Sequence, residues 1–256
     1  MSDWQPSHYL RFSDERTRPA RDLLAQVPLA DARTIYDLGC GPGNSTALLV
    51  ARYPGADITG IDNSPAMLEA ARKSCPGVSF ATGDLSRWMP DRAPDLLFSN
   101  AAFHWVPGHL SVLERLSTTL SDGGVLAVQM PDNLMEPSHR LMQAAAEQGP
   151  WAGKLSAAQA ARERLPAPET YYARLKPYFR RLDLWHSIYN HPVPGVDGII
   201  AWLKTTGLKP FIDPLTEAER ASYLAVYRDL LREAYPAQAD GTVLLRFPRF
   251  FLAGAS

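Results

Sequence analysis

Cysteine is scarce in this sequence, and long apolar runs are missing from it. The only two cysteines, Cys40 and Cys75, form neither a CxxC pair nor a spacing typical of metal ligands. We therefore interpret both as reduced thiols, expect no bound metal, and expect a cytoplasmic protein. Residues 1–10 lack the apolar centre of a secretory signal, and no segment approaches the roughly 20 apolar residues of a membrane helix. The sequence thus predicts no contact with a membrane.

The net charge of the chain is also small. Its 26 basic and 27 acidic residues leave a net charge of -1. Nucleic acids and anionic membranes attract proteins with a marked excess of basic residues, so neither is an expected partner. The composition does not indicate an oligomeric state, which the sequence leaves open. A small-molecule substrate is the expected partner.

What the sequence does contain is a regular alternation of apolar runs and helical patterns between residues 34 and 130. With 46% hydrophobic residues among 256, the chain can form one large α/β domain. The alternation predicts parallel strands with helices on both faces. We expect a doubly wound, seven-stranded, mostly parallel sheet of the Rossmann type. The strands predicted in this half are 34–38, 57–61, 78–81, 95–99 and 125–129, and the predicted helices are 45–53, 65–73 and 110–120.

Three glycines directly follow the first predicted strand. Gly39, Gly41 and Gly43 precede a helix that begins near Asn44, and a loop without side chains lets a ligand approach the backbone. In an open parallel sheet, ligands bind beyond the carboxyl ends of the strands. The spacing is GxGxG, whereas the dinucleotide fingerprint GxGxxG needs a third glycine where Asn44 stands. The loop therefore predicts a nucleotide-type cofactor without a pyrophosphate cradle.

Polar residues also follow the next three predicted strands. Asp62 is placed to accept both ribose hydroxyls, although the same spacing would serve NAD. Asp84 can accept a hydrogen bond from an adenine amino group. Asp37, near the end of the first strand, can face the cationic amine of an amino-acid tail, and Asn100 follows the fourth strand. Together these positions predict a bound nucleoside that carries an amino acid.

The combination resembles the class I S-adenosylmethionine-dependent methyltransferases. The resemblance is carried by Asp37–Gly43, Gly60–Asp62, Gly83–Leu85 and Asn100–Ala101. It implies that the methionine part contacts Asp37 and the glycines, the ribose Asp62, and the adenine Met67, Asp84 and Leu85. The cofactor-binding residues expected on this basis are Asp37, Gly39, Gly41, Gly43, Asn44, Asp62, Asn63, Met67, Asp84, Leu85 and Asn100.

A second resemblance covers nearly the whole chain and is to the trans-aconitate methyltransferase family. Its segments are Tyr9–Phe12, Glu15–Ala20, His104–Trp105, Gln129–Asn133 and Phe247–Phe250. The resemblance implies esterification of one carboxylate of trans-aconitate or a related small polycarboxylate, giving a monomethyl ester and S-adenosylhomocysteine. The residues expected to bind the substrate are Tyr9, Arg11, Arg16, Arg18, His104, Trp105 and Gln129.

Esterification of a carboxylate requires little catalytic machinery. A carboxylic acid with a pKa of roughly 4 is already ionised at neutral pH, so no general base and no catalytic residue is expected. Alignment of the acceptor opposite the departing sulfur is the main requirement. Arginine suits the other carboxylates because its planar guanidinium bonds them at two points. The cluster of Arg11, Arg16 and Arg18 therefore predicts a lid that holds substrate or the carboxylate of the cofactor.

On this basis we expect residues 1–256 to form a single methyltransferase domain. Thr17 is the expected cap of the first helix, with Pro19 in its first turn. Pro248 predicts an edge position, a bulge or a break in the last strand. The expected parts are an N-terminal lid and helix (1–30), a cofactor-binding core (31–131), and helical elaborations with two final strands near 182–191 and 243–253 (132–256).

Several alternatives stay open at this point. The acceptor could be another acid, such as a malonyl group on a carrier protein. The chain could also be a nicotinamide oxidoreductase, against which the GxGxG spacing and Asp84 argue, or a sensor that binds S-adenosylmethionine without catalysis. Single residues also have structural interpretations: Cys40 as a packed side chain, each lead-in arginine as a surface charge, and Arg246 and Arg249 as solvent-exposed residues. For Trp151, Trp185 and Trp202, packing is the favoured interpretation.

Overall fold

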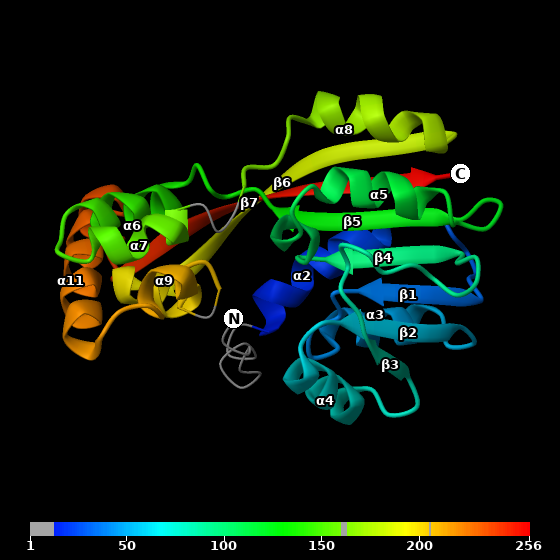
Figure 1. Cartoon of the computed structure of the whole chain (residues 1–256), viewed down its shortest axis with the longest axis horizontal. Helices are drawn as coiled ribbons and strands as arrows, with labels where there is room; N and C mark the ends of the chain where they lie inside the picture. The colour runs from blue at the N-terminus through cyan, green and yellow to red at the C-terminus, as the bar shows by residue number, and fades with distance from the viewer. Residues whose placement is uncertain (1–12, 160–162, 205) are drawn as a thin grey trace. The chain divides into compact units, whose positions relative to one another are not determined.

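The computed structural model describes residues 13–159, 163–204 and 206–256, and the described chain divides into two compact units (Figure 1). Unit 1 contains the described residues up to Pro131 together with Leu165–Ser187 and Phe250–Ser256. Unit 2 contains the described residues of Asp132–Arg164 and Ile188–Arg249.

Unit 1 is built around parallel strands. The sheet has seven strands in the order β3-β2-β1-β4-β5-β7-β6, and β1, β2, β3, β4 and β5 pair in parallel (Figure 1). The neighbours of β1 are β2 and β4, so the strand order reverses at its carboxyl end, where open α/β sheets bind ligands. The predicted doubly wound, mostly parallel fold is confirmed. The strands are β1 (Thr34–Leu38), β2 (Asp57–Asp62), β3 (Ser79–Thr82), β4 (Leu96–Asn100), β5 (Val125–Pro131), β6 (Arg181–Pro194) and β7 (Thr242–Ala255).

Helices connect and cover these strands. All seven residues of β5 are buried, as expected for a strand covered on both faces. On α5, Leu113 and Leu116 are fully buried and belong to the same apolar cluster as Leu126 of β5. The helices of unit 1 are α2 (Ser13–Ala25), α3 (Asn44–Arg52), α4 (Pro65–Ser74), α5 (His109–Ser117) and α8 (Pro168–Leu175), with 3-10 turns η2 (Phe103–Trp105) and η3 (Lys176–Tyr178).

The N-terminal helix begins earlier than expected. Because α2 begins at Ser13, Thr17 lies inside the helix and the prediction that it caps the helix was wrong. Its hydroxyl instead accepts a hydrogen bond from the amide of Asn44, at 3.3 Å. Pro19 also lies inside α2 and not in its first turn; its ring is buried. Tertiary packing thus outweighs the local preference of proline for a first turn.

The last strand also differs from expectation, because β7 lies between β5 and β6 and is not an edge strand. The N–H of Ser256 donates to the carbonyl of Gly124, just before β5, and the N–H of Asp132, just after β5, donates to the carbonyl of Pro248. Strand β7 is therefore antiparallel to β5. Pro248 of β7 lies opposite Asp132, the residue after the end of β5. The N–H that proline lacks therefore removes no hydrogen bond from the middle of the β5–β7 pairing.

Unit 2 is mainly helical. Two tyrosines of α11 attach it to α6: the hydroxyl of Tyr223 donates to the carbonyl of Met142 at 3.0 Å, and that of Tyr227 to the carbonyl of Ser138 at 2.6 Å. None of the helices in the described residues combines the length and the apolar character that crossing a bilayer would require. The helices of unit 2 are α6 (Pro137–Glu147), α7 (Ala152–Gln159), α9 (Gly195–Leu203), α10 (Lys209–Ile212) and α11 (Glu217–Ala234).

Candidate cofactor and acceptor site

The loop between β1 and α3 takes its shape from glycine. Gly39, Gly41 and Gly43 have φ angles of +72°, +54° and +93°, which residues with a side chain rarely adopt. The N–H groups of Gly39 and Cys40 donate to the carbonyl of Ile61 at 2.7 and 3.0 Å. The loop is therefore held against the carboxyl end of β2.

The glycines of this loop have different surroundings. A Cβ atom on Gly39 would lie 2.2 Å from the Cβ of Ala102, which is an impossible approach. A Cβ on Gly41 would meet no atom of the described chain within 4 Å. Packing inside the protein thus requires Gly39, whereas Gly41 borders open space that a ligand can enter.

Asp37 is fully buried beneath the loop. Its Oδ2 accepts hydrogen bonds from the hydroxyls of Ser45, at 2.8 Å, and Thr46, at 2.6 Å. Its Oδ1 is also buried and has no hydrogen-bond partner in the described part of the chain. Burial raises the pKa of this carboxyl group to about 6; the two hydroxyls oppose the rise and the charge of Asp62 adds to it. A cation beside Oδ1 would relieve this unfavourable state.

Asp62 ends β2 and fastens two segments. Its Oδ2 accepts from the N–H of Gly41 and its Oδ1 from the N–H of Ser64, both at 2.9 Å. The Ser64 hydroxyl caps α4 by accepting from the N–H of Met67 at 3.3 Å. Asn63 beside Asp62 is exposed, and Met67 is buried.

Asp84 lies in an exposed turn after β3. Its Oδ1 accepts from the N–H and hydroxyl of Ser86, at 3.0 and 2.7 Å, and its Oδ2 pairs with Arg87 at 3.2 Å. The hydrogen bonds from Ser86 are the main reason that the pKa of Asp84 lies below its usual value. The neighbouring Leu85 is buried and reaches the loop, since its Cδ1 would lie 3.6 Å from a Cβ on Gly39.

Asn100 ends β4 beside the glycine loop. Its Oδ1 is buried and finds no hydrogen-bond partner among the residues that the structure describes. The next residue, Ala101, has φ +58° and is the only non-glycine residue with positive φ in the described chain. Such strain is often found at binding sites. Ala101 and Ala102 were not predicted as site residues, although two small residues directly after Asn100 were a usable signal.

The predicted acceptor residues are described only in part. Tyr9 and Arg11 lie outside the described residues, as does the side chain of Arg16. Arg18 is exposed on α2 and forms an ion pair with Asp22 at 3.9 Å. The hydrogen bond between Thr17 and Asn44 nevertheless places this part of α2 beside the first residue after the glycine loop.

The other three predicted acceptor residues lie near the carboxyl ends of β4 and β5. The ring of the buried His104 lies 4.9 Å from that of Trp105, which is 36% exposed. Gln129 is completely buried in β5, and its carbonyl accepts from the N–H of Ala101 at 2.9 Å. Gln129 and Asn100 are also direct neighbours in the pairing of β4 with β5.

Comparison with known proteins decides the family. Residues 35–124 match the model of a family described as "Methyltransferase domain". The chain is 54% identical over 252 residues to a trans-aconitate 2-methyltransferase of Rhodopseudomonas palustris (strain BisB18), covering 98% of both chains. It is 52% identical over 254 residues to the protein of that name from Paracidovorax citrulli, again with 98% of both covered. The chain belongs to the trans-aconitate 2-methyltransferase family.

Solved structures agree at the level of the fold. The YcgJ protein of Bacillus subtilis superposes with a TM-score of 0.59 at 14% identity, covering 93% of this chain and 98% of that one. Membership of the trans-aconitate 2-methyltransferase family confirms the predictions of a methyltransferase and of S-adenosylmethionine as cofactor. It contradicts the alternative of a nicotinamide oxidoreductase.

The residues present fit this cofactor. The buried Oδ1 of Asp37 offers an acceptor to a cationic amine, and the surface at Gly41 is open. The carboxylate of Asp62, at the end of β2, accepts from the N–H of Gly41 and so borders the same loop. Ser45 and Thr46, whose hydroxyls donate to Asp37, were missed by the sequence analysis, although two hydroxyl residues that follow Asn44 just after the glycine loop are a recognisable feature.

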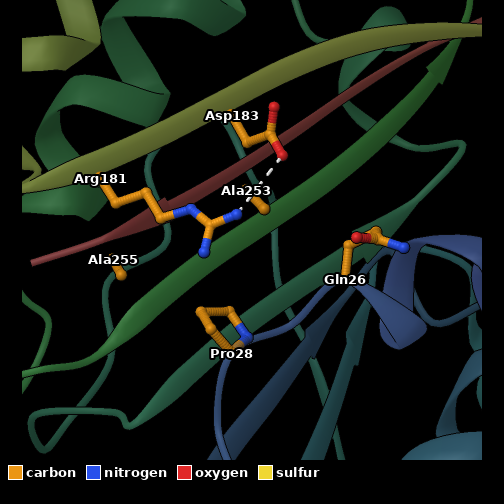
Figure 2. Close-up of a pocket in the computed structure, with 6 residues that line it drawn as sticks. All are labelled: Gln26, Pro28, Arg181, Asp183, Ala253 and Ala255. Atoms are coloured by element: carbon orange, nitrogen blue, oxygen red, sulfur yellow. Dashed lines mark ion pairs between the residues drawn. The ribbon is translucent and has the colours of Figure 1, made fainter.

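A small pocket elsewhere in unit 1 is not part of this site. Figure 2 shows its lining, which includes an ion pair of 3.9 Å between Arg181 and Asp183. Its volume of about 10 Å³ holds roughly one water molecule. Ala253 and Ala255 of the lining belong to the end of β7, which pairs with the beginning of β5. The pocket therefore lies at the amino ends of the parallel strands, whereas the glycine loop lies at their carboxyl ends.

Arg246 and Arg249 of β7, in unit 2, were both expected to be exposed to solvent. Arg246 is exposed and pairs with Glu136. Arg249 is only 4% exposed, so the prediction was wrong for this residue. Trp151 and Trp202 are buried, and Trp185 stacks on Phe251 at 5.0 Å, which confirms that the three tryptophans pack against the protein.

Proposed function

We propose that this protein transfers the methyl group of S-adenosylmethionine to one carboxylate of trans-aconitate, or of a related small polycarboxylate, giving a monomethyl ester and S-adenosylhomocysteine. The observation that carries the proposal is identity above 50% over 98% of the chain to relatives named for this reaction. The acceptor is a small molecule, and the protein acts in the cytoplasm as one functional methyltransferase domain.

In this proposal the cofactor lies along the carboxyl ends of β1, β2, β3 and β4. Asp37 receives the cationic amine at Oδ1, the loop from Gly39 to Asn44 passes along the methionine part, and Asp62 accepts the ribose hydroxyls. Met67 and Leu85 form apolar contacts with the adenine, while Asp84 accepts from its amino group. The remaining cofactor contacts come from Asn63 and Asn100.

Bound S-adenosylmethionine supplies an electrophilic methyl group on a sulfonium. The protein then has to align an acceptor carboxylate in line with the departing sulfur and exclude water from it. An ionised carboxylate needs no general base. The proposed acceptor contacts of the core are His104, Trp105 and Gln129. The N-terminal lid and helix (1–30) would contribute Tyr9, Arg11, Arg16 and Arg18.

The test is a panel of small di- and tricarboxylic acids incubated with S-adenosylmethionine that is labelled in its methyl group. The expected result is a base-labile labelled ester from trans-aconitate, formed faster than from the other acids. Malonyl carrier protein serves as the competing acceptor. Absence of an ester from trans-aconitate, with S-adenosylhomocysteine still binding in calorimetry, would reject the proposed acceptor while leaving the cofactor assignment intact.

The double variant Arg11→Ala/Arg16→Ala tests the lid. Each lost guanidinium removes a charge-assisted contact worth about 1.5–3 kcal/mol, so we expect the acceptor KM to rise at least about tenfold. The matched control is Arg21→Ala, which removes an exposed arginine of α2 and should leave the acceptor KM unchanged. An unchanged KM in the double variant would show that these arginines do not bind the acceptor.

A further inference from the structure

The first turn of α3 contributes two hydroxyl groups to the cofactor site. Ser45 and Thr46 are the second and third residues of this helix, which begins at Asn44, and both side chains are buried. Their hydroxyls donate to the same atom, Oδ2 of Asp37, at 2.8 and 2.6 Å. A hydroxyl carries a single proton. Both donors are therefore used by one buried carboxyl group.

This arrangement makes the two oxygens of Asp37 different. Oδ2 receives both hydroxyls, whereas Oδ1 is buried and has no hydrogen-bond partner among the described residues. The bond from Thr46 has the length of a hydroxyl that donates to an ionised carboxylate. The geometry therefore fits a charged Asp37 that is fixed through Oδ2 and keeps Oδ1 for a ligand.

The other titratable groups around Asp37 do not favour its charge. Burial and the charge of Asp62, at the end of β2, raise the pKa of Asp37, and the two hydroxyls lower it. Cys40 of the glycine loop and Cys75 after α4 stay protonated at neutral pH, because burial and the charge of Asp37 raise the pKa of both thiols. The hydroxyls thus stabilise the carboxylate against its surroundings.

We propose that Ser45 and Thr46 are positioning residues for the cofactor, whose hydroxyls hold Asp37 as a carboxylate with Oδ1 available to the cationic amine of S-adenosylmethionine. The inference deepens the proposed function and rests on the contact proposed there between Asp37 and this amine. The same hydrogen bonds also join β1 to α3 across the glycine loop. The test therefore has to separate control of the charge from bracing of the loop.

Calorimetry of S-adenosylhomocysteine binding from pH 5 to pH 8 tests the inference with Thr46→Val, which keeps the side-chain shape and removes the hydroxyl. Loss of a hydrogen bond to a charged group shifts a pKa by about one unit. The fall in affinity expected near pH 6 in the wild type should therefore move to about pH 7. The variant should bind about fivefold more weakly than the wild type at pH 6 and about equally at pH 8.

Matched controls separate this role from bracing of the loop. Ser99→Ala removes another fully buried hydroxyl, which donates to the carbonyl of Leu38 at 2.7 Å, and should leave the pH profile unchanged. Thr46→Ser keeps the hydroxyl and should show the wild-type profile. Ser45→Ala loses the longer of the two bonds and should shift the profile in the same direction by less. The nucleoside 5′-methylthioadenosine, which lacks the amino acid, should bind Thr46→Val and the wild type equally at each pH.

The outcomes distinguish this inference from the proposed function. A loss of affinity in Thr46→Val that is equal at pH 6 and pH 8, or that extends to 5′-methylthioadenosine, overturns the inference and assigns the hydroxyls to the shape of the loop. A wild-type profile in both Thr46→Val and Ser45→Ala also overturns it. If Thr46→Val does not fold, Ser45→Ala supplies the same test. A wild type that shows the expected pH profile but forms no ester from trans-aconitate would reject the proposed acceptor and leave this inference standing.

Discussion

Replacing Asp37 by asparagine is expected to weaken the binding of S-adenosylhomocysteine about 10- to 100-fold, as measured by calorimetry at pH 7.5. The buried Oδ1 of Asp37 is proposed to receive the cationic amine of the ligand, and a hydrogen bond to a charged group contributes about 1.5–3 kcal/mol. Asparagine keeps one oxygen for the hydroxyls of Ser45 and Thr46 but loses the charge.

The same substitution should not destabilise the protein without ligand. Burial raises the pKa of Asp37 from 3.8 to about 6, which corresponds to roughly 3 kcal/mol of stability lost at neutral pH. A neutral amide removes this cost, so the unliganded variant should have a Tm at least as high as that of the wild type. A lower Tm together with unchanged affinity would contradict the proposed role of Asp37.

Affinity should also depend on pH through Asp37. The pKa of Asp37 is raised in the folded state. Its contribution to the free energy of unfolding is therefore fully present below about pH 4, where the carboxyl group is protonated, and is lost as the pH rises through about 6. A cationic ligand favours the ionised carboxylate, so binding of S-adenosylhomocysteine should weaken as the pH falls below about 6. Calorimetry at pH 5 and pH 7.5 measures the change, and Asp37→Asn, which has no carboxyl group at this position, should show no such dependence.

Gly39→Ala should cause the largest loss of stability of any single change in the cofactor loop. The left-handed backbone costs an alanine about 1–2 kcal/mol, and crowding in a packed interior costs about 1–3 kcal/mol more. Both apply at Gly39, where φ is +72° and the new Cβ would lie 2.2 Å from that of Ala102. For a chain of this size the total lowers Tm by roughly 5–15 °C in a thermal unfolding experiment.

Two further variants separate the cost of the left-handed backbone at Gly39 from the cost of the collision with Ala102. Gly41→Ala has the left-handed backbone but open surroundings, so its Tm should fall less, while its Cβ enters the space proposed for the cofactor and weakens binding. The double variant Gly39→Ala/Ala102→Gly removes the colliding atom and leaves the next one at 3.6 Å, so it should recover part of the lost Tm. Equal Tm values for Gly39→Ala and Gly41→Ala would contradict the prediction, because they would show that the contact between the new Cβ and Ala102 does not destabilise the protein.

Some of the site could be predicted because its information is local. The glycines of the loop and Asp62 each directly follow or end a strand that the alternating apolar pattern identifies. Their positions at the carboxyl ends of neighbouring strands then follow from parallel pairing. The structure bears out this geometry, since the Asp62 carboxylate accepts from the N–H of Gly41.

Other features depend on segments far apart in the sequence. The position of β7 between β5 and β6 rests on pairing over more than 110 residues, and no local pattern around Pro248 reveals it. The requirement for Gly39 comes from Ala102, which approaches it only in the folded chain. The prediction that Thr17 caps its helix was wrong: the helix begins at Ser13, and the Thr17 hydroxyl accepts a hydrogen bond from the side chain of Asn44.

The sequence by itself determined the lack of a net charge that would attract polyanions, the doubly wound sheet, the glycine loop and the acidic residues that follow it, because these depend on composition and on patterns within one strand–helix unit. Only the tertiary structure decided which charges are buried. Arg246 and Arg249 are three residues apart in one strand, yet Arg246 is exposed and Arg249 is buried, with its guanidinium over the ring of Phe247. Asp37 likewise has its raised pKa because folding removes water from it. Burial is a property of the neighbours that folding assembles, and those neighbours come from distant parts of the chain.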